Sequence, residues 1–200
     1  MKGESIMKAL MCVPNISEGT DLDVVEKIVD TIRSAPGVML LDYSSNVNHN
    51  RSVITYIGQP EAVVSATKKL TKTALALIDM TRHKGSHPRQ GAVDVVPFIP
   101  IRGIAEEDAV SLARKFGKFV GDELGVPVYF YEDAATRPER QSLAKVRKGQ
   151  YEALAAKLEK SEWAPDEGPC EFVARSGSVQ VASRFPLVAF NVNLATTDVD

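Results

Sequence analysis

Apolar residues follow two different spacings along the first hundred positions, and these spacings predict strands and helices in turn. Short apolar or β-branched runs, typical of buried strands, occupy 9–13, 38–43, 52–57 and 93–99. Two longer segments, 22–32 and 60–78, carry apolar residues at the spacing of an amphipathic helix. Asp21 is placed to cap the first helix, and Pro60 suits the first turn of the second.

The predicted order, strand, helix, strand, strand, helix, strand, is that of a ferredoxin-like sandwich, an α+β fold in which two helices cover one face of a sheet. This topology places the connections 15–20, 44–50 and 81–91 at one end of the sheet and the connections 34–37 and 58–60 at the other. The first three contain histidine, arginine, asparagine and acidic residues, whereas the other two contain little beyond turn residues. Because loops on a rigid scaffold commonly carry function, we expect a site at the first end.

The rest of the chain predicts additional helices and strands around this unit. Apolar periodicity indicates a helix over 106–124, a strand over 126–131, short helices over 141–149 and 151–160, an irregular stretch over 163–177 and a final strand over 187–194. No internal repeat is present. The prediction is one compact sandwich followed by a C-terminal strand.

Composition and charge exclude several classes of protein. A chain of 200 residues with 44% hydrophobic and 25% charged residues can close one good core. The net charge is −2 and the basic residues are dispersed, so we expect neither a nucleic-acid nor a membrane partner. Cys12 and Cys170 lie too far apart for a zinc ribbon, and no segment is apolar and long enough to cross a membrane, so a cytoplasmic location is expected.

The densest group of reactive side chains is RHKGSHPRQGAVD, residues 82–94. Histidine exchanges protons near neutral pH, and arginine can bind a carboxylate through two parallel hydrogen bonds. Pro88 and the neighbouring glycines would hold His87 on a stiff loop. His87 is therefore the candidate for acid–base chemistry.

Other interpretations apply to the rest of this motif. Arg82 or Lys84 can simply complement the negative end of the preceding helix. His83 and His87 have the spacing of a helical metal pair, but Gly85 and Pro88 interrupt a helix and no matching carboxylate motif follows, so no metal site is expected. For His83 we favour structural packing over catalysis.

The other two loops at this end supply further polar residues. One contributes Asn15, Ser17 and Glu18, and the other contributes His49 and, just beyond, the pair Asn50-Arg51. Each of these is an ordinary turn or capping residue by itself. Their expected convergence with His87 makes them candidates for substrate contact.

Five motifs resemble those of the formiminotransferase family. They are CVPNISEG at 12–19, LLD and NR at 40–42 and 50–51, IDMTRHKGSHPRQGAVDVVPFIP at 78–100, DELGVPVYFY at 122–131 and WAPDEGP at 163–169. The resemblance covers essentially the whole chain. It implies transfer of a formimino group between the 5-nitrogen of tetrahydrofolate and the amino group of L-glutamate, a step of histidine degradation and one-carbon metabolism.

The resemblance also implies roles for particular residues. His87 matches the catalytic histidine of the family and would act as general base and acid. The folate-associated segment would comprise Gly168, Pro169, Cys170, Glu171, Phe172, Val173, Ala174, Arg175, Ser176 and Gly177. The candidates for substrate binding are Asn15, Glu18, Asp42, Asn50, Arg51, Lys84, Arg89 and Asp94. Of these, the cations would face the carboxylates of glutamate and folate, and the acids would face the cationic amidine. Tetrahydrofolate would be a co-substrate, and no metal is required.

Two departures from the family pattern affect these roles. Where some members have a second acid two residues after the position of Asp42, this chain has Ser44, and Arg175-Ser176 precede Gly177 where an aromatic residue can stand.

The family enzyme has a second lobe that begins near the end of this sequence. We therefore assign 1–182 to the N-terminal subdomain and 183–200 to a linker and the first strand of a truncated C-terminal subdomain. Either the chain is a fragment or a separate lobe completes it, and a homodimer is expected. Two alternatives to the transferase are a folate-binding module without turnover and an enzyme that uses formyl folate.

Overall fold

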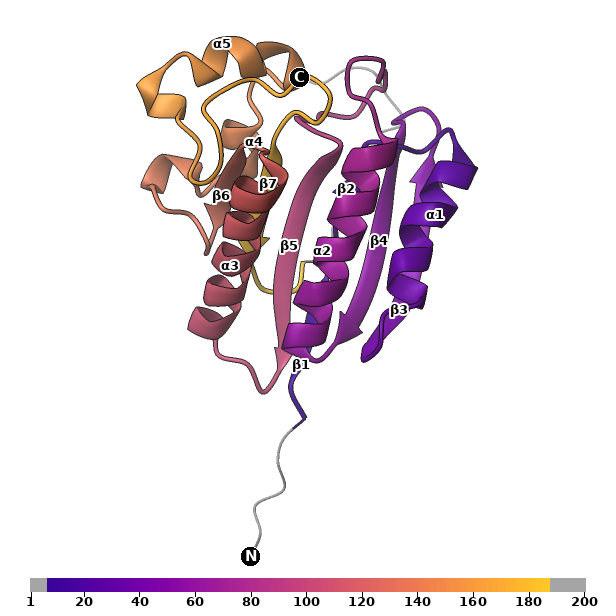
Figure 1. Cartoon of the computed structure of the whole chain (residues 1–200). Helices are drawn as coiled ribbons and strands as arrows, with labels where there is room; N and C mark the ends of the chain where they lie inside the picture. The colour runs from indigo at the N-terminus through magenta and orange to yellow at the C-terminus, as the bar shows by residue number, and fades with distance from the viewer. Residues whose placement is uncertain (1–6, 188–200) are drawn as a thin grey trace, which may run out of the picture.

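The computed structural model describes residues 7–187 and forms one sheet covered mainly by helices (Figure 1). Its strands are β1 (Ala9–Cys12), β2 (Asn15–Ile16), β3 (Val38–Asn46), β4 (Arg51–Gly58), β5 (Val93–Arg102), β6 (Val128–Glu132) and β7 (Val179–Ser183). Its α-helices are α1 (Leu22–Arg33), α2 (Pro60–Leu77), α3 (Glu106–Leu124), α4 (Leu143–Val146) and α5 (Leu154–Leu158). Short 3₁₀ turns occupy Pro138–Arg140, Tyr151–Ala153 and Ser161–Trp163.

The order of the strands confirms the predicted α+β fold. β1 and β2 are two halves of one strand, interrupted at Val13-Pro14, and both pair antiparallel with β4 and β5. β3 pairs antiparallel with the other edge of β4. The sequence β5, β1/β2, β4, β3 is the strand order of the ferredoxin-like sandwich. β7 and β6 then extend the sheet beyond β5, and both run parallel to it.

β7 was not predicted from the sequence. Its residues, VQVAS, are all buried, because the strand lies inside the sheet between β5 and β6 and is covered on both faces. A five-residue strand with Gln180 and Ser183 at buried positions has no strong apolar alternation to reveal it. The predicted strand 187–194 lies outside the described residues except for Leu187, which has no regular structure.

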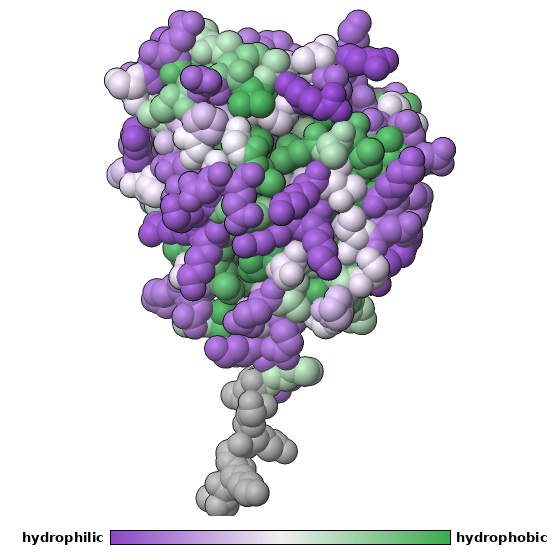
Figure 2. All heavy atoms as spheres, viewed as in Figure 1, coloured by the Kyte–Doolittle hydropathy of each residue, from purple (hydrophilic) through white to green (hydrophobic). Residues whose placement is uncertain are grey.

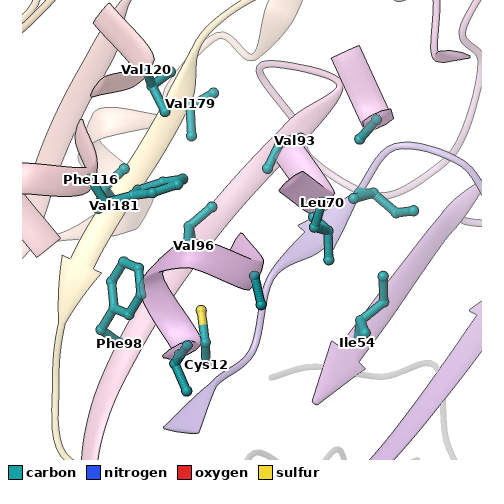
Figure 3. Packing of buried hydrophobic residues seen from close by; sticks show 14 of the residues in the cluster. Cys12, Ile54, Leu70, Val93, Val96, Phe98, Phe116, Val120, Val179 and Val181 are labelled. Carbon is teal, nitrogen blue, oxygen red and sulfur yellow. The ribbon is translucent and has the colours of Figure 1, made fainter. Parts of the chain in front are cut away.

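The main core lies between the sheet and helices α1, α2 and α3. The predicted caps are present, since Asp21 accepts a hydrogen bond from Val24 N at 3.1 Å and Pro60 begins α2. Figure 3 shows Phe98 of β5 and Phe116 of α3 in this core, where their rings meet edge to face at 5.5 Å. Cys12 is fully buried here, as expected for a cysteine that packs as a small hydrophobe.

The outer surface of the helical layer is polar. Figure 2 shows hydrophilic side chains spread over α1, α2 and α3, with apolar groups between them. Among residues 7–187, no helix combines the length and the apolar character needed to cross a membrane.

A second, smaller core lies on the opposite face of the sheet. There, α4 and α5 pack over β6 and β7, and the buried residues are Tyr129, Tyr131, Val146, Leu154, Leu158 and Ala182. This packing brings the chain that follows α4 beside the N-terminal half of β5. It therefore adds residues around position 147 to the end of the sheet where the three polar loops were expected.

Candidate functional site

The three polar loops meet at one end of the sheet, as the topology predicted (Figure 1). Asn50 joins them, since its Oδ1 accepts a hydrogen bond from Gly19 N at 2.9 Å and its Nδ2 donates to Lys84 O at 3.0 Å. Asn50 adopts a left-handed conformation with φ of 47°, which asparagine tolerates well. Ser86 N also donates to Asn48 O at 3.1 Å. Loops that are far apart in the sequence are thus fixed against each other by direct hydrogen bonds.

The half-buried His87 lies at this junction with one ring nitrogen committed. Its Nδ1 lies 2.7 Å from Pro88 O. A carbonyl oxygen can only accept, so in the neutral ring Nδ1 carries the proton and Nε2 holds the free lone pair. The His49 ring lies 5.4 Å away, centroid to centroid. This arrangement leaves Nε2 of His87 available to take a proton from a bound molecule.

The charges around His87 favour its neutral form. Partial burial lowers the pKa of His87, and the nearby cations Arg51 and Arg147, together with His49, lower it further. The hydrogen bond to Pro88 opposes this shift. A larger fraction of His87 side chains is therefore neutral at pH 7, and able to accept a proton, than for an isolated histidine.

Arg51 and Asp94, both predicted site residues, differ in whether another side chain of the protein pairs with their charge. Burial raises the pKa of Asp94, while an ion pair to Arg147, with Oδ2 and Nη1 2.6 Å apart, counteracts the rise. Asp94 also accepts a hydrogen bond from Gln90 N at 2.8 Å. Within residues 7–187 the Arg51 guanidinium has no carboxylate or hydrogen-bond partner, and burial lowers its pKa. Arg51 is thus a partly desolvated cation whose N–H donors are not used by the described residues.

His83 and Arg89 are held by the protein itself. Arg89 Nε donates to His83 Nδ1 at 3.2 Å, so His83 carries its proton on Nε2 and donates it to Asn50 O at 2.8 Å. Arg89 is buried, and its two terminal nitrogens bind Glu152 at 2.9 and 2.8 Å. This geometry agrees with structural packing of His83. A carboxylate of a substrate would have to displace Glu152 to reach Arg89.

The remaining predicted substrate-binding residues differ in their exposure and in their hydrogen bonds. Glu18 Oε1 accepts hydrogen bonds from the backbone of Gly19, Thr20 and Asp21 and so shapes its own loop. Asn15 is buried in β2 and donates to Val13 O at 2.9 Å. Lys84 is exposed. Asp42 is exposed on β3 opposite Thr55, about 13 Å along the sheet from Arg51 at ~3.3 Å per residue. Their roles in binding stay predictions.

The glycine-bounded segment 168–177 packs directly against the 81–91 loop. Gly91 and Gly177 face each other in an antiparallel bridge, flanked by hydrogen bonds from Ala92 N to Ser176 O at 2.8 Å and from Ser178 N to Gln90 O at 3.1 Å. A Cβ on Gly177 would lie 2.0 Å from Gln90 O, so a side chain here is excluded. The predicted folate-associated segment therefore adjoins the loop that carries His87.

Phe172 of this segment forms an aromatic pair with Tyr151 of the 3₁₀ turn Tyr151–Ala153. The Phe172 ring, 37% exposed, lies 5.4 Å from the ring of Tyr151, whose hydroxyl donates to Ala174 O at 2.6 Å. Exposed aromatic rings provide surfaces on which a planar heterocycle can stack. Sequence reasoning missed Tyr151 because nothing in its local pattern distinguishes it from a helix residue.

Two further observations concern pockets and metals. A polar pocket of about 320 Å³ is lined by parts of all three loops and by α1 and α2. His83 lines this pocket, whereas His87 does not. Within residues 7–187, no three or more histidine, cysteine, aspartate or glutamate side chains gather as metal ligands would.

Comparison with known proteins identifies the family. Residues 9–184 match the model of the formiminotransferase domain, N-terminal subdomain. The chain belongs to the formiminotransferase family. A glutamate formimidoyltransferase of Streptococcus pyogenes serotype M1 is 49% identical over 193 residues, which are 96% of this chain and 64% of that protein. A protein of the same name from Thermoplasma acidophilum is 45% identical over 97% of this chain and 64% of its own length.

The bifunctional relatives are longer. A formimidoyltransferase-cyclodeaminase of Mus musculus is 48% identical over 93% of this chain but only 34% of its own length. The chain thus spans 64% of the length of each glutamate formimidoyltransferase and 34% of the length of the bifunctional mouse protein. The resemblance deduced from the motifs is confirmed at the level of the family.

Proposed function

We propose that this chain is the folate-binding lobe of a glutamate formimidoyltransferase, with His87 as general base and acid. The observation that carries the proposal is the state of His87, whose Nδ1 proton is bound by Pro88 O while Nε2 has no hydrogen-bond partner in the described part of the chain. The guanidinium of Arg51, which has no partner among residues 7–187, is a cation that can bind the carboxylate of a substrate. Membership of the family supplies the reaction class.

The reaction needs one group that can move a proton twice. As the attacking amine adds to the amidine carbon, its proton goes to Nε2 of His87 and a tetrahedral carbon forms. When the bond to the departing nitrogen breaks, the same proton passes from Nε2 to that nitrogen. His87 ends in its original neutral form, so protons balance over the transfer.

Charge complementarity assigns Arg51 to a substrate carboxylate. Glutamate and the tail of folate both carry carboxylates, which a guanidinium can bind through two parallel hydrogen bonds. Partial burial strengthens such a pair because water screens it less. Lys84 is exposed and suits a weaker contact with the same tail.

Tetrahydrofolate is the proposed co-substrate, and the aromatic pair supports its placement. Phe172 lies on the segment that touches the 81–91 loop through Gly91 and Gly177, and Tyr151, in the 3₁₀ turn Tyr151–Ala153, packs against it. We therefore propose that the pteridine stacks on this pair, next to the loop that carries His87.

The assembled protein requires further proposals. We expect small-molecule substrates, a homodimer and a cytoplasmic location. Because the chain spans 64% of the monofunctional relatives, a folate-binding module that turns over only with a second lobe is the alternative to the complete transferase.

His87→Asn tests the mechanism. We expect the rate constant for transfer from formiminoglutamate to tetrahydrofolate to fall by about two to four orders of magnitude, the usual range for loss of an acid–base group, while folate affinity stays nearly unchanged. Lys118→Met, which removes an exposed cation of α3, is the control. Unaltered turnover in His87→Asn would remove His87 from the mechanism.

Measurements on the parent chain distinguish the alternative functions. Binding of reduced folate without transfer would support the module. Faster turnover of a formyl donor than of a formimino donor would support the formyl-folate enzyme.

A further inference from the structure

Arg147 lies between a buried carboxylate and the carbonyl that holds His87. Its Nη1 is 2.6 Å from Asp94 Oδ2 and 3.1 Å from Pro88 O. The same carbonyl oxygen accepts the Nδ1 proton of His87 at 2.7 Å. Arg147 follows α4, which packs on the face of the sheet opposite α1, α2 and α3. The contacts form a continuous chain from Asp94 to the imidazole.

We propose that Arg147, anchored by Asp94, is a positioning residue that fixes the orientation and tautomer of His87 through the Pro88 carbonyl. This inference rests on the proposed function of His87. It adds a residue that the sequence motifs did not single out. Arg147 would act through Pro88 and would not itself bind the substrate.

The anchor is rigid because Asp94 is fully buried and held from several sides. Gln90 N donates to its Oδ1 at 2.8 Å. The buried amide of Gln180, with its nitrogen turned toward Asp94, donates to the same oxygen at 3.2 Å. A carboxylate enclosed in this way keeps its charge only while the guanidinium partner is present. The position of Arg147 is therefore set by the interior of the protein.

The carbonyl of Pro88 transmits this order to the imidazole. Pro88 is exposed, whereas Arg89 on the other side of the same peptide is buried. The hydrogen bond from Arg147 adds a direct constraint on the carbonyl oxygen itself. Without it the carbonyl can turn away, Nδ1 of His87 loses its acceptor, and both neutral tautomers become populated. A smaller fraction of the rings would then present a free Nε2.

The charges that face His87 act on its pKa. They are Arg51 from β4, His49 from the loop between β3 and β4, and Arg147 itself, all cationic or able to become so. Replacing Arg147 with a neutral residue removes one of these cations, which raises the pKa of His87, whereas loss of the Pro88 acceptor lowers it. These two effects oppose each other, so the tautomer rather than the pKa of His87 reports on its positioning.

Nitrogen-15 NMR of the imidazoles tests the inference without requiring turnover. The chain contains three histidines, and the His87 signals are assigned by their loss in His87→Asn. In the parent chain we expect the tautomer with the proton on Nδ1 to dominate. In Arg147→Met we expect mixed tautomers. An unchanged tautomer in Arg147→Met would overturn the proposal.

Kinetics distinguish positioning from substrate binding. Arg147→Met is expected to lower kcat about ten- to a hundredfold, the range found when hydrogen-bond partners that orient metal-binding imidazoles are removed, with KM for formiminoglutamate within about twofold. Arg147→Lys keeps the charge and should retain the pKa of His87 and part of the rate. Arg33→Met, which removes an arginine paired on the surface of α1, serves as the control. A raised KM with unchanged kcat would identify Arg147 as a carboxylate-binding residue and refute positioning.

A second variant separates positioning from folding. Arg147→Met leaves a buried carboxylate unpaired and is expected to destabilise the chain. Adding Asp94→Asn removes that charge and should restore much of the stability while kcat stays low. Recovery of the parental kcat in the double variant would show a purely structural pair. If the parent shows the expected tautomer but neither binds reduced folate nor transfers the formimino group, the proposed function fails and the positioning of His87 stands.

Discussion

Gly177→Ala is expected to destabilise the contact between the two segments that flank the site. Gly177 has φ of +67°, which costs alanine about 1 kcal/mol. The added Cβ would also lie 2.0 Å from Gln90 O and 2.8 Å from the Cα of Gly91, both backbone atoms that no side-chain rotation can move. Separating the segments would weaken the hydrogen bonds Ala92 N to Ser176 O and Ser178 N to Gln90 O, each worth about 1 kcal/mol. The expected loss is about 3 kcal/mol.

Gly125→Ala is a matched control for this change. Gly125 has φ of +63°, and a Cβ there would meet no atom within 4 Å. It therefore carries the conformational cost alone, about 1 kcal/mol. Urea unfolding should separate the two variants by about 2 kcal/mol, and thermal unfolding should lower Tm by roughly 6–12 °C for Gly177→Ala against 2–4 °C for Gly125→Ala. Equal losses would refute the argument that close backbone approach excludes a side chain at Gly177.

Two further predictions concern the interior. Arg140 is buried, its Nη1 lies 2.7 Å from Asp166 Oδ2, and its Nη2 donates to Ala164 O at 2.6 Å. Arg140→Met should therefore lower the free energy of unfolding, measured in urea, by about 3–5 kcal/mol. A loss under about 1 kcal/mol would contradict the pairing. Burial raises the pKa of the Cys12 thiol to about 12, whereas Cys170 is exposed. A disulfide reagent at pH 8 should therefore modify one thiol in the native chain and two in denaturant, and rapid modification of both without denaturant would show that Cys12 is accessible.

Individual site residues show where sequence reasoning succeeds and where it stops. His87 was proposed from its residue type and its expected stiff loop, its contact with Pro88 is local in the sequence, and its catalytic role stays a prediction. The partner of Arg89 was not foreseen, because Glu152 is 63 residues away and lies in a segment with no motif of its own. Arg147 was not predicted as a site residue for the same reason, since its partner Asp94 is 53 residues away. Charged residues are frequent, and sequence alone does not say which pairs meet.

The spacing of apolar residues determined the order of strands and helices, and this order determined which loops share one end of the sheet. The physical reason is that each element is short and its periodicity is a local property, while a βαββαβ chain has few ways to bury its apolar faces. Tertiary structure decided the rest. Burial of β7 between β5 and β6, and packing of α4 against the far face, placed Arg147 beside His87 through contacts between segments more than 50 residues apart.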